Sequence, residues 1–269
     1  MAVRRVVTVL AAVALSLSVT AVVAATPASA VANGKAAAAG QYQFAVRLTM
    51  THIPRSDGTF YNSACSGALI SPTWIITAGH CFHDINRNPV SGPVPYATTA
   101  TLGTNDLSVS QGESRSVVTV RQSSSTDVAL AQLSAPVIDV TPLAVSRAKP
   151  ALGSVVTLAG WGATSDVNAV PSTKLNTGQM KIKTVKTSYV YVVGYSPSSS
   201  TSACLYDSGA PYFLTPSSAA PQLVSVESDG PACPHTTPET TARVDNIASW
   251  ISSVVAAGAT PSSSRFRTR

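Results

Sequence analysis

The sequence contains little charge: Asp, Glu, Lys and Arg make up 11% of its 269 residues, against 45% for hydrophobic residues. Such a composition excludes a disordered chain and predicts a fold with a sizeable core. The formal net charge is +6, but five of the positive charges lie near the two ends of the chain, on Arg4, Arg5, Arg265, Arg267 and Arg269. The remainder is nearly neutral and lacks the basic stripe of a nucleic-acid-binding protein.

Cysteine is also scarce. Only four are present, at Cys65, Cys81, Cys204 and Cys233. No Cys-x-x-Cys or His-x-x-x-His spacing occurs, so a zinc site is not expected. Four cysteines allow three disulfide pairings, and free thiols are the alternative.

A calcium loop is excluded despite a partial match. Asp84, Asn86 and Asn88 imitate its first three ligand positions, but Pro89 stands where the loop needs Gly and Pro95 where it needs Glu. These residues predict a surface loop, and no metal or cofactor is implied.

Only one stretch is long and apolar enough to cross a bilayer, and it lies at the N-terminus. Residues 6–25 are uncharged, follow Arg4-Arg5 and precede the small residues Ala28-Ser29-Ala30. A membrane anchor is the alternative, but the cleavage motif and the absence of stop-transfer charges favour a signal peptide over residues 1–30. We therefore expect a secreted, extracellular protein with no membrane contact after cleavage, and the Ala-rich leader suggests a bacterial exoenzyme.

Long helical patterns are few. Short apolar or alternating segments predict antiparallel strands, as a β-barrel requires, at residues 41–50, 65–70, 98–102, 114–121, 128–133 and 189–193. A hairpin turn is predicted at residues 55–59. One helix is predicted over residues 244–257, where apolar side chains share a face.

One short stretch has the residues for nucleophilic chemistry. Asp207-Ser208-Gly209 follows Cys204 closely, and a turn pinned by a disulfide would aim the serine hydroxyl and nearby N–H groups at one point. A serine needs a base to take its proton and donors to hold the oxyanion that forms. The tripeptide alone is weak, because a surface turn has the same composition.

The base and its orienting acid are found upstream. A β-branched run ends in Ala78-Gly79-His80-Cys81, which predicts a buried strand that places His80 at its end. Asp127 directly precedes another apolar strand. The other histidines, His52, His83 and His235, lack this context and are expected to be exposed or structural.

With His80, Asp127 and Ser208 in this order, the chain resembles the chymotrypsin-like (trypsin-family) serine endopeptidases from about Val31 to about Ala257. The resemblance implies two packed six-stranded antiparallel β-barrels with a C-terminal helix, and no cofactor. It implies protein or peptide substrates and the disulfides Cys65–Cys81 and Cys204–Cys233. We expect a monomer.

The implied domain covers residues 31–257. Its two lobes meet near residues 134–151, where Pro136, Pro142 and Pro150 cluster, and a flexible basic tail follows at residues 258–269.

The resemblance also assigns roles. Ser208 is the nucleophile, His80 the general base and acid, and Asp127 the residue that orients the imidazole. The N–H groups of Tyr206 and Ser208 form the oxyanion hole.

Cleavage after Ala30 would create a new N-terminus at Val31, whose α-ammonium would pair with buried Asp207. We expect signal peptidase itself to produce this end. A start at Thr26 would instead leave a short propeptide, and an ordinary secreted N-terminus is the further alternative.

Three residues depart from the family pattern. Tyr206 stands where the family nearly always has Gly, so its Cβ is expected to strain the backbone. Ala210 also replaces a usual Gly. Asp229 replaces an aromatic that walls the substrate cleft, and so adds a negative charge there.

The primary specificity pocket is assigned to Ser202 at its floor, with Ala203, Ser228, Gly230 and Glu239 around it. Ser202 is not the carboxylate that a trypsin-like floor needs. Glu239 either enters the pocket and pairs with a basic side chain or faces solvent. We expect a mixed preference for large apolar residues with some tolerance for Lys or Arg.

Two other functions are considered. An inactive protease-like binding protein would explain Tyr206 and Asp229 as signs of decay. An α/β-hydrolase esterase is disfavoured, because Ser208 lacks a Gly-x-Ser-x-Gly motif and the acid precedes the serine.

Overall fold

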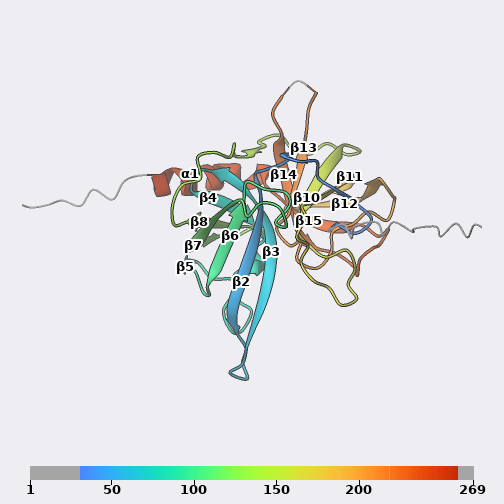
Figure 1. Cartoon of the computed structure of the whole chain (residues 1–269). Helices are drawn as coiled ribbons and strands as arrows, with labels where there is room; N and C mark the ends of the chain where they lie inside the picture. Colours follow the sequence, from blue (N-terminus) through green and yellow to red (C-terminus); the bar gives the residue numbers. More distant parts are fainter. Residues whose placement is uncertain (1–30, 218, 260–269) are drawn as a thin grey trace, which may run out of the picture.

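The computed structural model describes residues 31–217 and 219–259. The signal peptide expected over residues 1–30 lies outside them, as do residues 260–269 of the tail expected over residues 258–269. Gly258 and Ala259, also expected in that tail, belong to the C-terminal helix. The described chain forms two closed six-stranded antiparallel β-barrels and one C-terminal α-helix, which confirms the expected fold (Figure 1).

The first barrel is built from residues 45–133. Its strands follow the order β7-β6-β2-β3-β4-β8, and pairing of β7 with β8 closes it. They are β2 (Ala45–Pro54), β3 (Phe60–Ser71), β4 (Trp74–Thr77), β6 (Thr98–Leu102), β7 (Glu113–Gln122) and β8 (Ala129–Leu133). The short β5 (Gly92–Pro93) pairs with β7.

The second barrel is built from residues 155–243. Its strands follow the order β11-β10-β13-β14-β15-β12, and pairing of β11 with β12 closes it. They are β10 (Val155–Gly160), β11 (Asn176–Val185), β12 (Tyr189–Ser196), β13 (Pro211–Leu214), β14 (Gln222–Asp229) and β15 (Glu239–Arg243). Two short strands join this sheet: β1 (Lys35–Ala36) beside β11 and β9 (Ala144–Val145) beside β14.

The strand predictions hold best where a short segment lies between clear turns. β6 has the predicted bounds, β7 is one residue longer than predicted at each end, and β8 begins one residue later than predicted. β2 begins later than predicted, because Tyr42 has a φ of +54° and its carbonyl accepts the N–H of Ala45 in a tight turn. The predicted hairpin at residues 55–59 is present, and the β2–β3 arm that carries it projects from the barrel (Figure 1).

The C-terminal helix α1 (Ala248–Ala259) follows a 3-10 turn at Asp245–Ile247. It therefore starts later than the predicted residue 244. α1 lies beside β4 and β8 of the first barrel, where Trp74 and Gln132 line a hollow together with Val254 (Figure 1). Ile251 is buried and lies near Ile70 of β3 and Val145 of β9. Within the described residues no helix reaches the length and apolarity needed to cross a bilayer.

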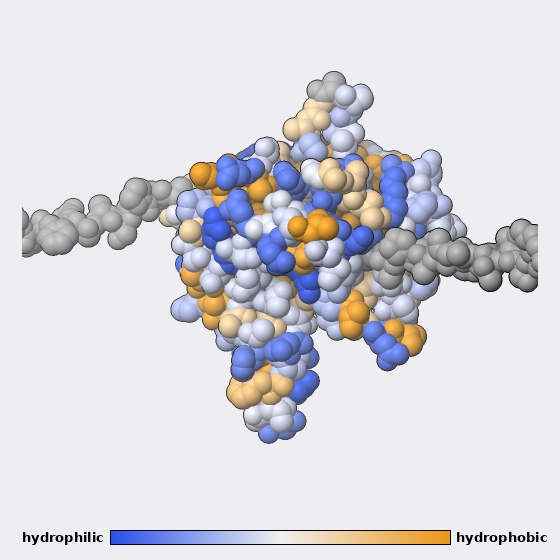
Figure 2. Space-filling model, in the orientation of Figure 1, coloured by the Kyte–Doolittle hydropathy of each residue, from blue (hydrophilic) through white to orange (hydrophobic). Residues whose placement is uncertain are grey.

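The barrels pack through an aromatic cluster. Phe213 of β13 lies against Tyr42 and Phe44, with ring centroids 4.9 and 5.3 Å apart and near edge-to-face geometry. On the face shown in Figure 2, apolar residues are scattered among polar ones rather than gathered in one broad patch.

Both disulfides implied by the resemblance are formed. Cys65 of β3 is bonded to Cys81, which lies in the 3-10 turn η1 (Gly79–Cys81) that follows β4. Cys204 is bonded to Cys233 and so joins two loops of the second barrel.

Replacing Cys65 and Cys81 together by Ser is expected to lower the free energy of unfolding by about 3 kcal/mol, because a cross-link over 16 residues is lost from the unfolded chain. Urea unfolding of the variant and the native chain measures the difference. Both proteins keep Cys204–Cys233, so the comparison isolates one bridge. An unchanged midpoint would contradict the expectation.

Candidate active site

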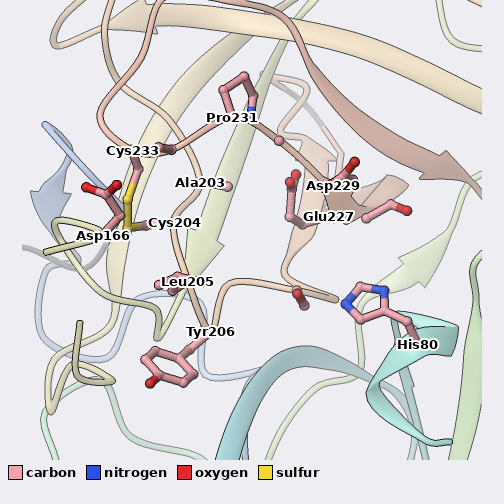
Figure 3. Close-up of a pocket in the computed structure, with 14 residues that line it drawn as sticks. His80, Asp166, Ala203, Cys204, Leu205, Tyr206, Glu227, Asp229, Pro231 and Cys233 are labelled. Atoms are coloured by element: carbon pink, nitrogen blue, oxygen red, sulfur yellow. A yellow bond between two sulfur atoms is a disulfide. The ribbon is translucent and has the colours of Figure 1, made fainter. Parts of the chain in front are cut away.

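The three residues that sequence analysis joined come from different loops. His80 lies in η1, Asp127 precedes β8, and Ser208 lies in the turn before β13. His80 and Ser208 line one cavity of about 350 Å³. Figure 3 shows His80 on one side of this cavity and the Cys204–Cys233 disulfide on the other.

The imidazole of His80 is held by a single carboxylate. Its Nδ1 lies 2.7 Å from Oδ2 of Asp127, and its backbone N–H donates to Oδ1 at 2.8 Å. Ser228 donates its hydroxyl to the same Oδ2 at 2.7 Å. Burial alone would raise the pKa of Asp127, but the hydrogen bonds and charge interaction from His80 and the bond from Ser228 hold it below its ordinary value. Asp127 thus stays ionised and fixes the ring.

A small residue is required immediately before His80. A Cβ on Gly79 would lie 2.7 Å from Oε1 of Gln122 and 2.9 Å from Oδ1 of Asp127. Gln122 also donates its amide to the carbonyls of Gly79 and Phe82, at 2.9 and 3.1 Å. Gln122 therefore stabilises η1, a role that no sequence pattern indicated.

The turn that carries Ser208 is fixed on both sides. The N–H of Asp207 donates to the carbonyl of Cys204 at 3.0 Å, and the carbonyl of Ser208 accepts the N–H of Ser66 at 2.9 Å. Gly209 has a φ of +82°, and a Cβ there would lie 2.0 Å from Oγ1 of Thr77. The Asp-Ser-Gly sequence is therefore a tight turn wedged against the first barrel.

Two backbone donors beside the serine have no partner. Within residues 31–217 and 219–259, the N–H groups of Tyr206 and Ser208 donate no hydrogen bond. Both residues line the cavity. An oxyanion formed next to the Ser208 hydroxyl is the kind of acceptor that such free donors bind.

Asp207 is fully buried in a cradle of backbone N–H groups. Gly162 donates to its Oδ1 at 2.8 Å and Cys204 to its Oδ2 at 3.0 Å, and the N–H of Val31 is a further donor. A Cβ on Gly162 would lie within 2.3 Å of the carboxyl carbon. Burial raises the pKa of Asp207 to about 7, and the N–H bonds offset this only in part.

The cavity wall differs in part from the predicted pocket. Ala203, Ser228 and Gly230 line it, whereas Ser202 and Glu239 do not. Both of these are fully buried. Oε2 of Glu239 accepts the N–H of Ala203 at 3.0 Å, and its other oxygen accepts the hydroxyl of Tyr212.

Glu227 lines the cavity instead, and sequence reasoning did not find it. It belongs to no motif, and only its position on β14 beside Ser228 places it there. Asp229, which was expected to add a charge near the cleft, also lines the cavity and is exposed.

The remaining histidines lie outside this arrangement. His83 is buried, and its Nδ1 lies 2.7 Å from the carbonyl of Asp84. The Asp84 carboxylate accepts the N–H groups of Asn86 and Asn88, as in the predicted surface loop. No three potential metal ligands cluster anywhere in the described part of the chain.

The family model described as Trypsin matches residues 31–251. The chain belongs to the trypsin family. Brachyurin from Leptuca pugilator is 33% identical over 110 residues, or 38% of this chain and 46% of brachyurin. Serine proteinase stubble from Drosophila melanogaster is 29% identical over 153 residues, or 54% of this chain and 19% of that protein. Serine protease 1 from Homo sapiens is 26% identical over 216 residues, or 72% of this chain and 80% of that protein.

The chain thus spans about half the length of brachyurin and about a fifth of stubble. The relatives named are animal proteins, and the bacterial origin suggested by the leader is not shown.

Tyr206 is the main departure of this trypsin-family chain, and the backbone strain expected there is present. Its φ is +75°, in the region that favours glycine. Its carbonyl accepts the Ser66 hydroxyl at 3.1 Å, and its phenol donates to the carbonyl of Ala169 at 3.3 Å. The chain therefore adopts the left-handed conformation with a non-glycine residue, and the N–H stays free.

Tyr206→Gly is expected to be more stable than Tyr206→Ala by about 1 kcal/mol, because only the alanine keeps a Cβ at positive φ. Both variants lose the same phenol contact, so their difference in urea unfolding reports the cost of a Cβ at positive φ, less the unfolded-state entropy that favours alanine. An alanine variant more stable than the glycine variant would contradict the expectation.

Proposed function

We propose that the protein is a secreted serine endopeptidase that hydrolyses peptide bonds through an acyl-enzyme. The observation that carries the proposal is the bonding of His80, whose Nδ1 is occupied by Asp127 while the ring lines the cavity of Ser208. A ring held in this way presents Nε2 as the base. Membership of the trypsin family supports the same chemistry.

In the proposed reaction, Ser208 Oγ attacks the scissile carbonyl while His80 Nε2 takes the hydroxyl proton. The carbonyl oxygen becomes an oxyanion, which the N–H groups of Tyr206 and Ser208 bind. His80 then gives its proton to the leaving amine, and the C–N bond breaks to leave the acyl-enzyme. Water then attacks the acyl carbonyl while His80 takes a proton from it. The ester bond to Ser208 Oγ breaks, His80 returns the proton to that oxygen, and the acid product leaves.

The proposed domain is residues 31–257, released from a signal peptide at residues 1–30 into the extracellular space as a monomer. Origin from a bacterium rests on the Ala-rich leader alone. An inactive binding protein is not favoured, because the departure at Tyr206 leaves its N–H free of other partners.

Ser208→Ala is expected to lower kcat/KM for a peptide substrate by about 10⁴-fold or more, because the nucleophile is lost. It should also abolish labelling by a fluorophosphonate, which reacts with an activated serine. Ser253→Ala, which removes an exposed hydroxyl on α1, is the matched control and should label like the native chain. A native chain that neither labels nor hydrolyses peptides would contradict the proposal.

The proposed partner of Asp207 is the α-ammonium of Val31 in the cleaved chain. In a chain that retains residues before Val31, the pKa of Asp207 is raised from 3.8 to about 7. A raised folded-state pKa gives stability that is present below the unfolded pKa and is lost as pH rises through the folded pKa. The uncleaved chain should therefore lose stability between pH 3.8 and about pH 7.

A chain that begins at Val31 should lack this loss, because an ammonium partner lowers the pKa of Asp207. Melting temperatures of the two chains across this pH range test the pairing. Buried Glu227 and Glu239 titrate in both chains and feel the charge of Asp207, so the Asp207→Asn variant is needed to separate their contribution from that of Asp207. Asp207→Asn in the uncleaved chain should remove the extra loss, and superimposable curves for the two starting chains would exclude the pairing.

A further inference from the structure

Three buried oxygen-bearing side chains meet behind the cavity. The hydroxyl of Tyr212, on β13, lies 2.7 Å from Oε2 of Glu227, on β14, and also contacts Oε1 of Glu239, on β15. Tyr212 and Glu239 are fully buried, and Glu227 is 4% exposed. Glu227 alone of the three lines the cavity, and Figure 3 shows it near Ala203 and Asp229.

The number of protons available fixes the charge of this group. Tyr212 carries one hydroxyl proton and can donate it to only one of its two carboxyl neighbours. The second oxygen–oxygen contact then needs a proton that a carboxyl group supplies. One of Glu227 and Glu239 is therefore protonated when the cavity is empty.

The surroundings place that proton on Glu227. Glu239 accepts the N–H of Ala203, and its Oε2 lies 3.5 Å from Nε2 of His235. Among the described residues, no donor other than Tyr212 reaches Glu227. The ionised form is thus better supported at Glu239.

Charges around Glu227 act in the same direction. Burial raises its pKa well above the ordinary value, and repulsion from Glu239, Asp207 and Asp229 adds to the shift. Burial also raises the pKa of Glu239, to about 7. No cationic Lys or Arg lines this cavity in the described chain.

We propose that Glu227 determines the specificity of this cavity and binds a substrate Lys or Arg side chain in exchange for the proton that it holds. The inference rests on the proposed peptidase function. The carboxyl proton passes to solvent as the ammonium or guanidinium enters, and an ion pair forms with Glu227. Ser202, buried out of the cavity, offers no competing carboxylate. With Glu227 protonated, the same cavity is neutral there and accepts apolar side chains.

Exchange of a proton for a cation makes the preference depend on pH. We therefore compare kcat/KM for an Arg substrate with kcat/KM for an otherwise identical Leu substrate. The titration of the catalytic residues affects both values equally, so it cancels in their ratio. While Glu227 remains protonated in the free enzyme, this ratio should rise by up to about tenfold per pH unit. Peptides that differ only at the residue before the scissile bond measure it from about pH 6 to about pH 8.

Glu227→Gln keeps the shape of the protonated side chain but cannot ionise. Arg cleavage at about pH 8 is expected to fall about 100-fold, Leu cleavage to change less than about threefold, and the ratio to become independent of pH. In Glu239→Gln the Tyr212 hydroxyl is free to donate to Glu227, which favours the ionised form of Glu227. The Arg-to-Leu ratio should therefore begin to rise at a lower pH. Glu113→Gln removes a charge from a surface pair with Arg115 and should leave the ratio unchanged.

Binding separates this inference from the proposed function. Ser208→Ala keeps the cavity without turnover, and calorimetry with benzamidinium in buffers of different ionisation enthalpy counts the protons released. About one proton per bound cation is expected near pH 6.5, with none for the additional Glu227→Gln change. A flat native ratio, or binding without proton release, would overturn the role of Glu227. If the native chain is not labelled by a fluorophosphonate, but Ser208→Ala still releases a proton on binding benzamidinium, the result would count against the peptidase function alone.

Discussion

The carboxylate of Asp127 is the interaction on which the rest of the site depends, because it accepts hydrogen bonds from both barrels. His80 donates from the 3-10 turn of the first barrel, and Ser228 donates from β14 of the second. A mostly buried carboxylate is unfavourable unless such donors surround it. The free energy that keeps Asp127 ionised therefore also favours docking of the two barrels in one orientation, and that orientation sets the angle of the imidazole.

The serine turn is positioned by a second contact between barrels. Ser66 of β3 donates its N–H to the carbonyl of Ser208 and its hydroxyl to the carbonyl of Tyr206, and it accepts the N–H of Trp161. Thr77 of β4 donates in turn to the carbonyl of Ser66 at 2.7 Å. His80 follows β4 closely, so His80 and Ser208 are both held relative to the same pair of strands.

Much of this could be predicted from the sequence, for identifiable reasons. The bounds of β6 were predicted correctly and those of β8 to within one residue, because turn residues bracket each of these short strands. The convergence of His80, Asp127 and Ser208 on one site followed from the resemblance, since no periodicity joins residues so far apart. The predicted start of β2 was wrong, because Tyr42 adopts a positive φ in a turn and a tyrosine gives no sequence signal for that conformation.

The cavity wall could not be predicted, because it depends on a strand irregularity. β14 pairs with β15 through Glu227 and Thr241, then through Asp229 and Thr240, with a register shift between them. A bulge of this kind changes which side chains face inward, and alternation along the sequence cannot locate it. Glu227 was therefore missed. Glu239 was expected in the cavity wall, but its hydrogen bonds with Ala203 and Tyr212 hold its carboxylate outside that wall.

The second barrel contains three buried carboxyl groups without a cationic Lys or Arg partner in the described chain. Asp207, Glu227 and Glu239 are all buried, and burial raises the pKa of each. No Lys or Arg of the described chain forms an ion pair with any of them. Each acid must then hold a proton or rely on neutral donors, which leaves its ionised form poorly supported.

A cation from outside the barrel would stabilise the ionised form of Asp207 and that of Glu227 in different ways. At Asp207 the charge would come from the chain itself, as a new N-terminus at Val31, and would remain permanently. At Glu227 it would come from a substrate side chain and leave with the product. In the two proposals the same physical condition, a buried carboxyl group without a resident cation, would serve maturation at Asp207 and selectivity at Glu227. Because Asp207 also repels Glu227, ionising one acid without its cation disfavours ionising the other.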